Sequence, residues 1–236
     1  MAINTRTRRD LLFVAAPALL VLVLIALAAF VRSPYIIPKL TRDIAATADV
    51  YPLFGALSSL GAFFWFAAAS ILLFSAAIIM RTDRRQAGFL AFGAVLTLAL
   101  WVDDYFLVHE TLAPRHLGVD EKAVYAGHLT LTVLYLVLFS KEIMRSRFTL
   151  LVLALGLLSL SAITDQVWHY FGDPGPWSYL VEDGFKWLGI VAWLRYHVDC
   201  GYAAVLRCLG VEPARSEGAV VSMREDPVVQ LRPHAS

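Results

Sequence analysis

Charged residues are scarce in this sequence: Asp, Glu, Lys and Arg make up 17% of its 236 residues, against roughly a quarter in an ordinary soluble domain. Hydrophobic residues make up 59%, and the mean hydropathy is +0.66. A chain of this composition cannot hide its apolar surface from water, which excludes an ordinary soluble fold. The formal net charge of +1 and the lack of a basic recognition stripe or zinc-finger spacing exclude nucleic acid as a partner.

The sequence is also poor in cysteine. Its two cysteines, Cys200 and Cys208, lie eight residues apart in a segment expected on the cytoplasmic side. This predicts free thiols in place of a disulfide framework. No His-x-x-x-His or His-Glu-x-x-His pattern is present, so the strongest sequence signature of a helical zinc site is missing.

Long apolar runs, by contrast, are abundant. Six runs come close to the roughly 20 residues that cross the hydrocarbon core of a bilayer: 11–31, 52–80, 88–108, 123–140, 149–168 and 179–197. The first run follows three arginines, but it is long for a signal peptide and lacks a small-residue cleavage site, so we expect a retained helix. The sequence predicts an all-α fold, an integral membrane bundle of about six transmembrane helices over residues 1–209.

Basic residues set the expected orientation of this bundle. They follow the second, fourth and sixth runs, so those ends and both chain termini should be cytoplasmic. Segment 33–51 is broken by Pro34 and Pro38 and is expected to lie at the membrane interface. The tail 210–236 has the composition of a disordered segment. We expect a multi-pass protein of a cell membrane, with the lipid bilayer as its main surroundings.

Ionisable residues nevertheless gather at helix ends that should share the outer leaflet. A charge in the hydrocarbon layer costs roughly 3 kcal/mol, so each one needs a partner, a cavity or a ligand. Six carboxylates against one lysine cannot all be neutralised by pairing, so the excess predicts bound protons, a bound cation or another functional site. The residues concerned are Asp103, Asp104, His109, Glu110, His128, Asp165, His169, Glu182, Asp183 and Lys186.

Helical spacing predicts how these side chains meet. Asp103 and Glu110 are seven residues apart and should share a helix face, with Asp104 pointing about 100° away. Lys186 is expected to pair with Asp103 or Asp183. His197, near the inner end of the last run, is expected at the interface. A network of this kind could also serve only to lock the packing of the helices.

The favoured function at this point is a metal-dependent or acid/base hydrolase acting on a lipid-like substrate. A metal-bound water would be the nucleophile and a remaining acid the general base. The candidate ligands of a divalent metal such as zinc are His109, His128, Asp165 and His169. The candidate catalytic residues are Asp103, Asp104, Glu110, Glu182, Asp183 and Lys186.

Two other functions stay open, so the sequence does not decide whether the chain is an enzyme. A proton or cation transporter or channel agrees with the richness in acids. Against it, the inner half of the bundle offers only a thin polar trail of Ser70, Ser75 and Thr97. A non-catalytic membrane subunit needs only the helices and their packing. The oligomeric state is undetermined.

Two motifs carry a resemblance to known proteins. Asp103-Asp104-x-x-x-x-His109-Glu110 and Glu182-Asp183-x-x-Lys186-x-x-Gly189 resemble a group of small bacterial multi-pass membrane proteins that carry no assigned function. The likeness covers the third to sixth helices, about half of the chain. It implies a location in a bacterial inner membrane and supplies no mechanism.

Overall fold

A computed structural model describes residues 5–42, 45, 48–51, 53–172, 175 and 177–211. Over these ranges the chain forms helices joined by turns, without a β-strand, so the expected all-α class is confirmed. The chain divides into two compact units, residues 1–56 and 57–236, which are described separately. The tail expected to be disordered lies almost entirely outside the described residues.

The first unit contains α1 (Thr5–Val31), the 3-10 helix η1 (Pro34–Ile36) and α2 (Ile37–Thr41). The break after α1 follows from the sequence. The hydroxyl of Ser33 accepts a hydrogen bond from the Tyr35 N–H at 3.4 Å, and Pro34 stands at the first position of η1, where a missing N–H costs nothing. Segment 33–51 thus begins with short helices, and its place at a membrane interface stays a prediction.

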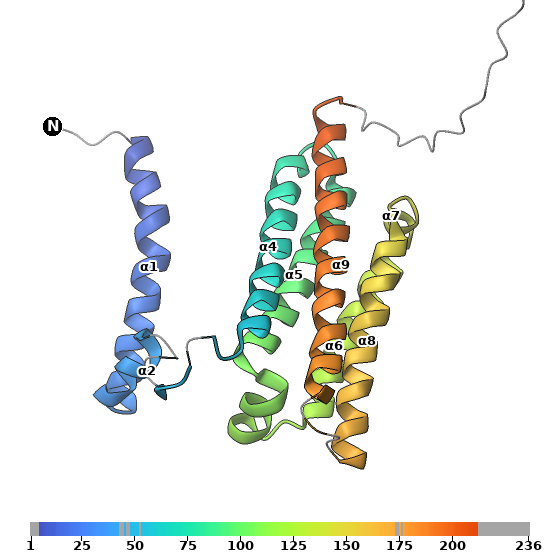
Figure 1. Cartoon of the computed structure of the whole chain (residues 1–236). Helices are drawn as coiled ribbons and strands as arrows, with labels where there is room; N and C mark the ends of the chain where they lie inside the picture. Colours follow the sequence, from blue (N-terminus) through green and yellow to red (C-terminus); the bar gives the residue numbers. More distant parts are fainter. Residues whose placement is uncertain are drawn as a thin grey trace, which may run out of the picture. The chain divides into compact units, whose positions relative to one another are not determined.

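The second unit is a helical bundle that begins within α4 (Ala56–Ile79), as Figure 1 shows. It continues with α5 (Arg84–Phe106), the π-helix η2 (Val108–Leu117), α6 (Glu121–Leu138), α7 (Ser140–Met144), α8 (Phe148–Phe171) and α9 (Trp177–Cys208). Asp83 caps α5 by accepting the N–H of Gln86 at 2.9 Å, and Asp120 caps α6 by accepting that of Lys122 at 2.8 Å. A long helix is present at each predicted apolar run.

Within the part of the chain that the structure describes, three helical segments are long and apolar enough to cross a membrane: Ala56–Ile79, Arg84–Phe106 and Phe148–Trp168. They support a membrane protein on length and composition. Several helix boundaries differ by a few residues from those expected, and two C-terminal ends differ in ways that matter for the site and the bundle. The third run was predicted to stay helical to residue 108, but α5 ends at Phe106. The sixth was predicted to end at residue 197, but α9 continues to Cys208, which makes it about 48 Å long.

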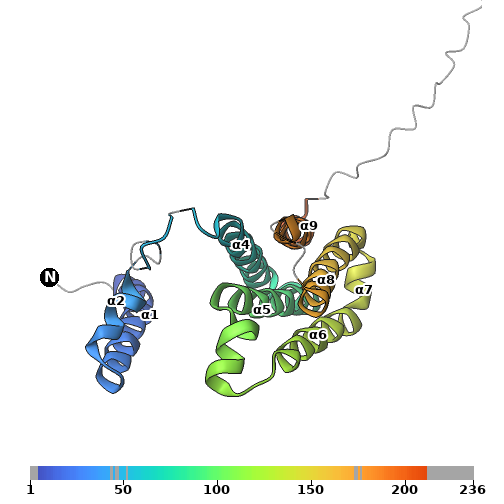
Figure 2. The same cartoon turned by 60° about the horizontal axis from the view of Figure 1, so that its bottom comes forward.

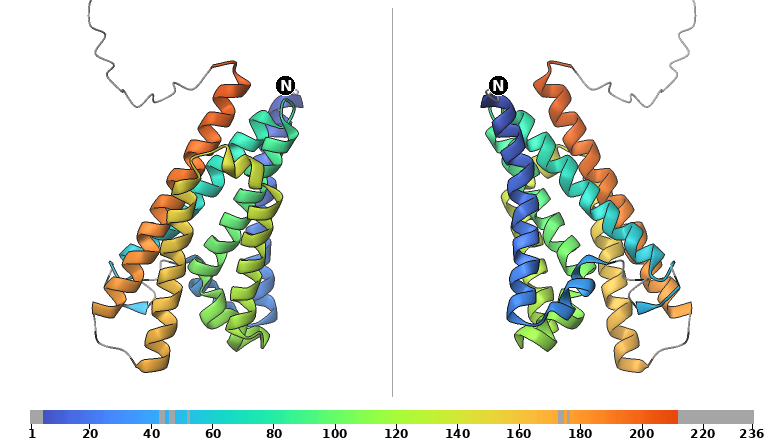
Figure 3. Two further views of the ribbon diagram at one scale, coloured as in Figure 1. Left: turned by 90° about the vertical axis from the view of Figure 1, so that its right-hand side faces the viewer. Right: turned by 90° about the vertical axis from the view of Figure 1, so that its left-hand side faces the viewer.

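Large side chains and close helix contacts hold the bundle together. Its buried core includes Leu72, Phe89, Leu96, Tyr135 and Trp193. Viewed toward one end, α9 lies between α4 and α8 (Figure 2), and α8 and α9 run side by side (Figure 3). That last approach depends on the missing side chain at residue 189, because a Cβ there would lie 2.8 Å from Cγ of Leu158.

Candidate functional site

The helix ends that carry the ionisable residues singled out above lie together at one end of the bundle, at the bottom of Figure 1. We call this region the charged end. It is formed where α5 and α8 finish, where η2 follows α5, and where α6 and α9 begin. Its described side chains are Asp103, Asp104, His109, Glu110, His128, Asp165, Glu182, Asp183 and Lys186.

The first group of the charged end is centred on Asp103, whose side chain is 11% exposed. One carboxylate oxygen of Asp103 accepts the backbone N–H of His109 at 2.9 Å, and the other lies 2.8 Å from Nδ1 of the His109 ring. Nδ1 of His128 lies 3.9 Å from the same second oxygen. Nε2 of His109 lies 3.4 Å from Glu110, and its ring stands against that of Tyr125.

The backbone explains why Asp103 meets His109 and not Glu110. Leu107 ends α5 in the left-handed conformation, with φ 51° and ψ 47°, which is uncommon for a residue other than glycine. The chain therefore leaves the axis of α5 before Glu110 and turns into η2. The seven-residue spacing that predicted a shared face for Asp103 and Glu110 does not apply across this break. π-Helical turns and strained backbone are both frequent at functional sites.

The two η2 residues of this group lie beyond the end of the apolar helix and hold opposite charges. Burial opposes protonation of His109, but its hydrogen bonds with Asp103 and Glu110 prevail and raise its pKa to about 10. The hydrogen bond with His109 lowers the pKa of Glu110, against the effect of burial. At neutral pH, His109 is therefore an imidazolium between two carboxylates.

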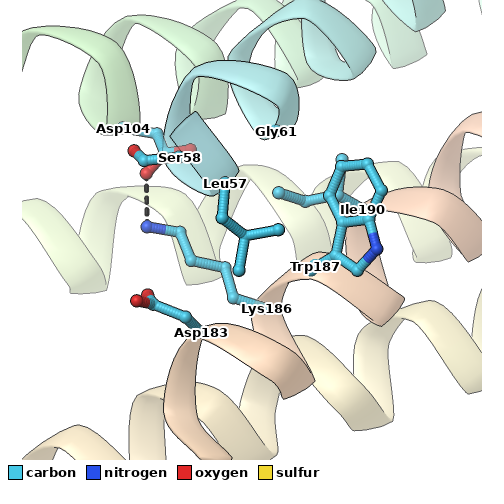
Figure 4. Close-up of a pocket in the computed structure, with 8 residues that line it drawn as sticks. All are labelled: Leu57, Ser58, Gly61, Asp104, Asp183, Lys186, Trp187 and Ile190. Carbon is cyan, nitrogen blue, oxygen red and sulfur yellow. Dashed lines mark ion pairs between the residues drawn. The ribbon is translucent and has the colours of Figure 1, made fainter. Parts of the chain in front are cut away.

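The second group lies on the other side of α5. Lys186 forms an ion pair with Asp104, and not with Asp103 or Asp183 as expected from spacing. Figure 4 shows the Lys186 side chain passing between the carboxylates of Asp104 and Asp183. These residues line a cavity of about 20 Å³, enough for about one water molecule. Its other walls are Leu57, Ser58, Gly61, Trp187 and Ile190.

The two groups are electrostatically connected. Glu110 lies within electrostatic reach of Lys186, and Asp165 of α8 lies within reach of both Glu182 and Tyr125. Tyr125 also interacts electrostatically with Asp103 and Glu110. Ionisable groups from five elements thus influence one another in a single region.

Comparison with known proteins gives one positive result. The family model described as domain of unknown function DUF8692 matches residues 12–200. The chain belongs to the DUF8692 family. The matched range contains the whole charged end and both motifs noted in the sequence. No curated protein and no solved structure matches the chain.

In this DUF8692 chain, the described side chains do not assemble the proposed metal ligands. Among the described side chains, no three His, Cys, Asp or Glu residues converge as a metal site requires. His109 and His128 both face Asp103, whereas Asp165 lies toward Glu182 and Tyr125. The side chain of His169 lies outside the described part of the chain. The metal site therefore stays a prediction.

Sequence reasoning missed several residues of this region of the DUF8692 chain. Ser58 and Trp187 line the cavity, although Ser58 sits in an apolar run and Trp187 has the position of an interfacial aromatic residue. His197 was expected at an interface but is fully buried in the bundle. The only sequence signal for Ser58 and His197 was that each is a polar residue inside an apolar run. This signal does not reveal which helix each side chain faces.

Proposed function

We propose that this chain is a multi-pass membrane protein that moves protons or a small cation, with the charged end as its ion-binding site. The observation that carries the proposal is the pair of ionic groups on two different faces of the end of α5. Asp103 faces an imidazolium, whereas Asp104 faces a lysine beside a cavity of about one water molecule. A site of this size suits a proton, a hydrated proton or a small ion better than a lipid headgroup.

The balance of charge supports the same function. Six carboxylates lie at the charged end, against Lys186 and the protonated His109. Asp104 and Asp183 share a single ammonium group at the cavity. A region with more carboxylates than cations attracts protons and cations, and intramembrane acids mark ion pathways.

The proposal includes the finer topology. Six spans, formed by α1, α4, α5, α6, α8 and α9, would place both termini in the cytoplasm and the charged end toward the outside, in a bacterial inner membrane. A Gly175→Cys change, in a variant lacking Cys200 and Cys208, tests this topology in intact cells. Labelling by an impermeant thiol reagent from outside is expected, and labelling only from the cytoplasmic side would contradict it.

Proteoliposomes test the ion-moving function directly. Purified protein is reconstituted with a pH-sensitive dye inside, and proton entry is followed under an imposed pH gradient with Na⁺, K⁺ or neither ion outside. The wild-type protein should carry protons or exchange them for one of the cations. Asp104→Asn should lower the rate at least tenfold, because it removes the carboxylate that binds the lysine at the cavity.

Asp49→Asn is the matched control for Asp104→Asn. It makes the same chemical change at an exposed position outside the bundle, where φ is 51°, a conformation that asparagine tolerates well. Its flux should equal that of the wild type. A proton flux with the wild-type protein that is no higher than in empty liposomes would contradict the proposed function. Equal proton flux in Asp104→Asn and the wild type would contradict it as well.

The Asp103–His109 pair favours a second candidate, an acid/base hydrolase with a lipid-like substrate. Asp103 holds the Nδ1 side of the imidazole, and Nε2 would exchange a proton with a substrate that displaces its 3.4 Å contact with Glu110. Because His109 is protonated at neutral pH, it would begin as a general acid. Release of water-soluble headgroup from mixed lipid micelles, abolished by His109→Gln, would support this candidate; no release from any lipid class would reject it.

A further inference from the structure

A buried polar network lies deeper in the bundle than the charged end. Its side chains are Thr97, Tyr135, Trp193 and His197, each at most 1% exposed. They come from α5, α6 and α9, and the proposed site uses none of them. Polar groups away from water are costly unless they are hydrogen-bonded, and intramembrane ionisable residues are functional-site candidates by default.

The network continues the contact between Asp104 and Lys186 along the antiparallel pair α5 and α9. Seven residues before Asp104 on α5 is Thr97, and seven residues after Lys186 on α9 is Trp193. The indole N–H of Trp193 donates to the Thr97 hydroxyl at 3.0 Å. Seven residues are close to two helical turns, so the second contact falls on the same faces, about 10 Å deeper.

A third contact follows four residues further along each helix. Gly93 of α5 faces His197 of α9, because a Cβ on Gly93 would lie 3.5 Å from Nε2 of His197 and 3.2 Å from the hydroxyl of Tyr135. The three successive contacts form a series that we call the polar ladder: Asp104–Lys186, Thr97–Trp193 and Gly93–His197 with Tyr135. His197 lies about 16 Å along α9 from Lys186, about half of the hydrocarbon thickness.

Hydrogen bonds define how His197 can handle a proton. Its Nδ1 lies 2.9 Å from the carbonyl oxygen of Trp193, which can only accept, so Nδ1 carries the ring hydrogen. Nε2 then holds the lone pair and faces the Tyr135 hydroxyl at 3.4 Å. A proton that arrives at Nε2 makes an imidazolium with both N–H groups directed at oxygen atoms, and its departure from Nε2 restores the neutral ring.

The cavity at the charged end extends along the same interface. Its α9 lining runs from Asp183 through Lys186 and Trp187 to Ile190, about 10 Å of helix. Ile190 is one turn before Trp193, so the lining of the cavity ends about one turn from the second contact of the ladder. Glycine at residue 61, also in the lining, keeps α4 close to Ile190, because a Cβ there would lie 3.1 Å from Cδ1 of Ile190.

We propose that the polar ladder carries protons, bridged by water, between the charged end and His197, which is the proton-accepting residue of the bundle interior. This inference rests on the proposed function and gives it the interior half of a path that the sequence did not reveal. Of the three residues first considered for that half, Thr97 belongs to the ladder, whereas Ser70 and Ser75 do not.

Flux through proteoliposomes tests the ladder. Tyr135→Phe removes the hydroxyl that faces Nε2. Thr97→Val removes the hydroxyl that accepts the Trp193 N–H and donates to the Gly93 carbonyl. Each change should lower proton flux at least tenfold. His197→Gln should do the same. Tyr196→Phe is the matched control, since Tyr196 is also buried but its hydroxyl bonds that of Ser146, which is not part of the ladder. Wild-type flux in folded Tyr135→Phe and Thr97→Val would overturn the inference.

Hydrogen exchange tests the ladder independently of flux. The indole N–H groups of Trp193 and Trp65 are both buried, with 1% and 3% of each residue exposed, and their rings are in contact. Trp65 Nε1 has no hydrogen-bond partner among the described residues, whereas Trp193 Nε1 donates to Thr97. In a dry interior the bonded Trp193 group should exchange more slowly in D₂O, as followed by NMR.

The ladder predicts the reverse order, with Trp193 exchanging faster than Trp65. Slower exchange at Trp193 would overturn it, whatever the flux result. If the wild-type protein shows no proton flux but its Trp193 N–H exchanges faster than that of Trp65, the proposed function is rejected and the ladder is retained as a path for water. The two failures are therefore distinguishable.

Discussion

The close contact between α8 and α9 provides a quantitative prediction, through the change Gly189→Ala. The new Cβ would lie 2.8 Å from Cγ and 3.0 Å from Cδ2 of Leu158, and 3.1 Å from the Leu158 backbone nitrogen. Carbon atoms in contact are normally about 3.5–4.0 Å apart, so the shortfall to Cγ is about 0.7–1.2 Å. Rotation of the Leu158 side chain can relieve the first two contacts but not the third, so the helices must separate.

Overpacking of this kind costs about 1–3 kcal/mol. Alanine also favours a helix interior over glycine by about 0.8–1.0 kcal/mol, which offsets part of that cost. Gly184→Ala isolates this gain, because it lies in the same helix and a Cβ there would have no neighbour within 4 Å. The two variants should therefore differ in unfolding free energy by about 1–3 kcal/mol, with Gly189→Ala the less stable.

Unfolding of both variants in mixed micelles, followed by tryptophan fluorescence as the fraction of denaturing detergent increases, measures this difference. Equal midpoints for Gly189→Ala and Gly184→Ala would refute the close approach of α8 and α9.

Three further predictions concern ionic contacts. Lys186→Met should lower the unfolding free energy by about 1–3 kcal/mol, because it leaves Asp104 without its partner. Adding Asp104→Asn should restore most of this loss. A double variant whose loss equals the sum of the two single losses would contradict the pairing. His109 has a pKa raised from 6.5 to about 10, so its contribution to stability is complete below about pH 6.5 and disappears as the pH rises through about 10. An unfolding series over that range should show a decline that His109→Gln lacks, and parallel curves would contradict this. At the opposite end of the bundle, Arg85 contacts Glu142 at 2.5 Å and lowers the pKa of the Glu142 carboxyl. The contribution of this ion pair to stability is therefore present above the ordinary Glu pKa of 4.5 and disappears as the pH falls through the lowered pKa. Glu142→Gln should remove that acid-sensitive component from a thermal unfolding series, and an unchanged acid profile would reject it.

The general location of the site could be predicted from the sequence, whereas the partner of each charged side chain could not. Charges inside apolar runs are easily recognised, and antiparallel helices bring their ends together, so the common position of Asp103, Asp165 and Lys186 followed. The partner of Asp103 depended on the left-handed backbone at Leu107. A leucine in the sequence gives no indication of that conformation, because it is uncommon for residues other than glycine. The partner of Lys186 depended on the rotation of α9 relative to α5.

The interior was harder to predict for a similar reason. Thr97 and His197 are isolated polar residues in apolar helices, and each has a local explanation when taken alone. Thr97 donates to the Gly93 carbonyl, and His197 bonds the Trp193 carbonyl one turn earlier. Only the register between α5 and α9 places them in one series, and register is set by packing between residues about 100 positions apart.

The electrical current carried by the wild-type protein in a planar bilayer tests the central claim most directly. With unequal pH and equal salt on the two sides, and then with equal pH and unequal Na⁺ or K⁺, the reversal potential identifies the moving ion. Proton or small-cation movement predicts a reversal potential that follows one of these gradients and a current that Asp104→Asn abolishes. A bilayer with verified protein insertion but no current above background under either gradient would contradict the account.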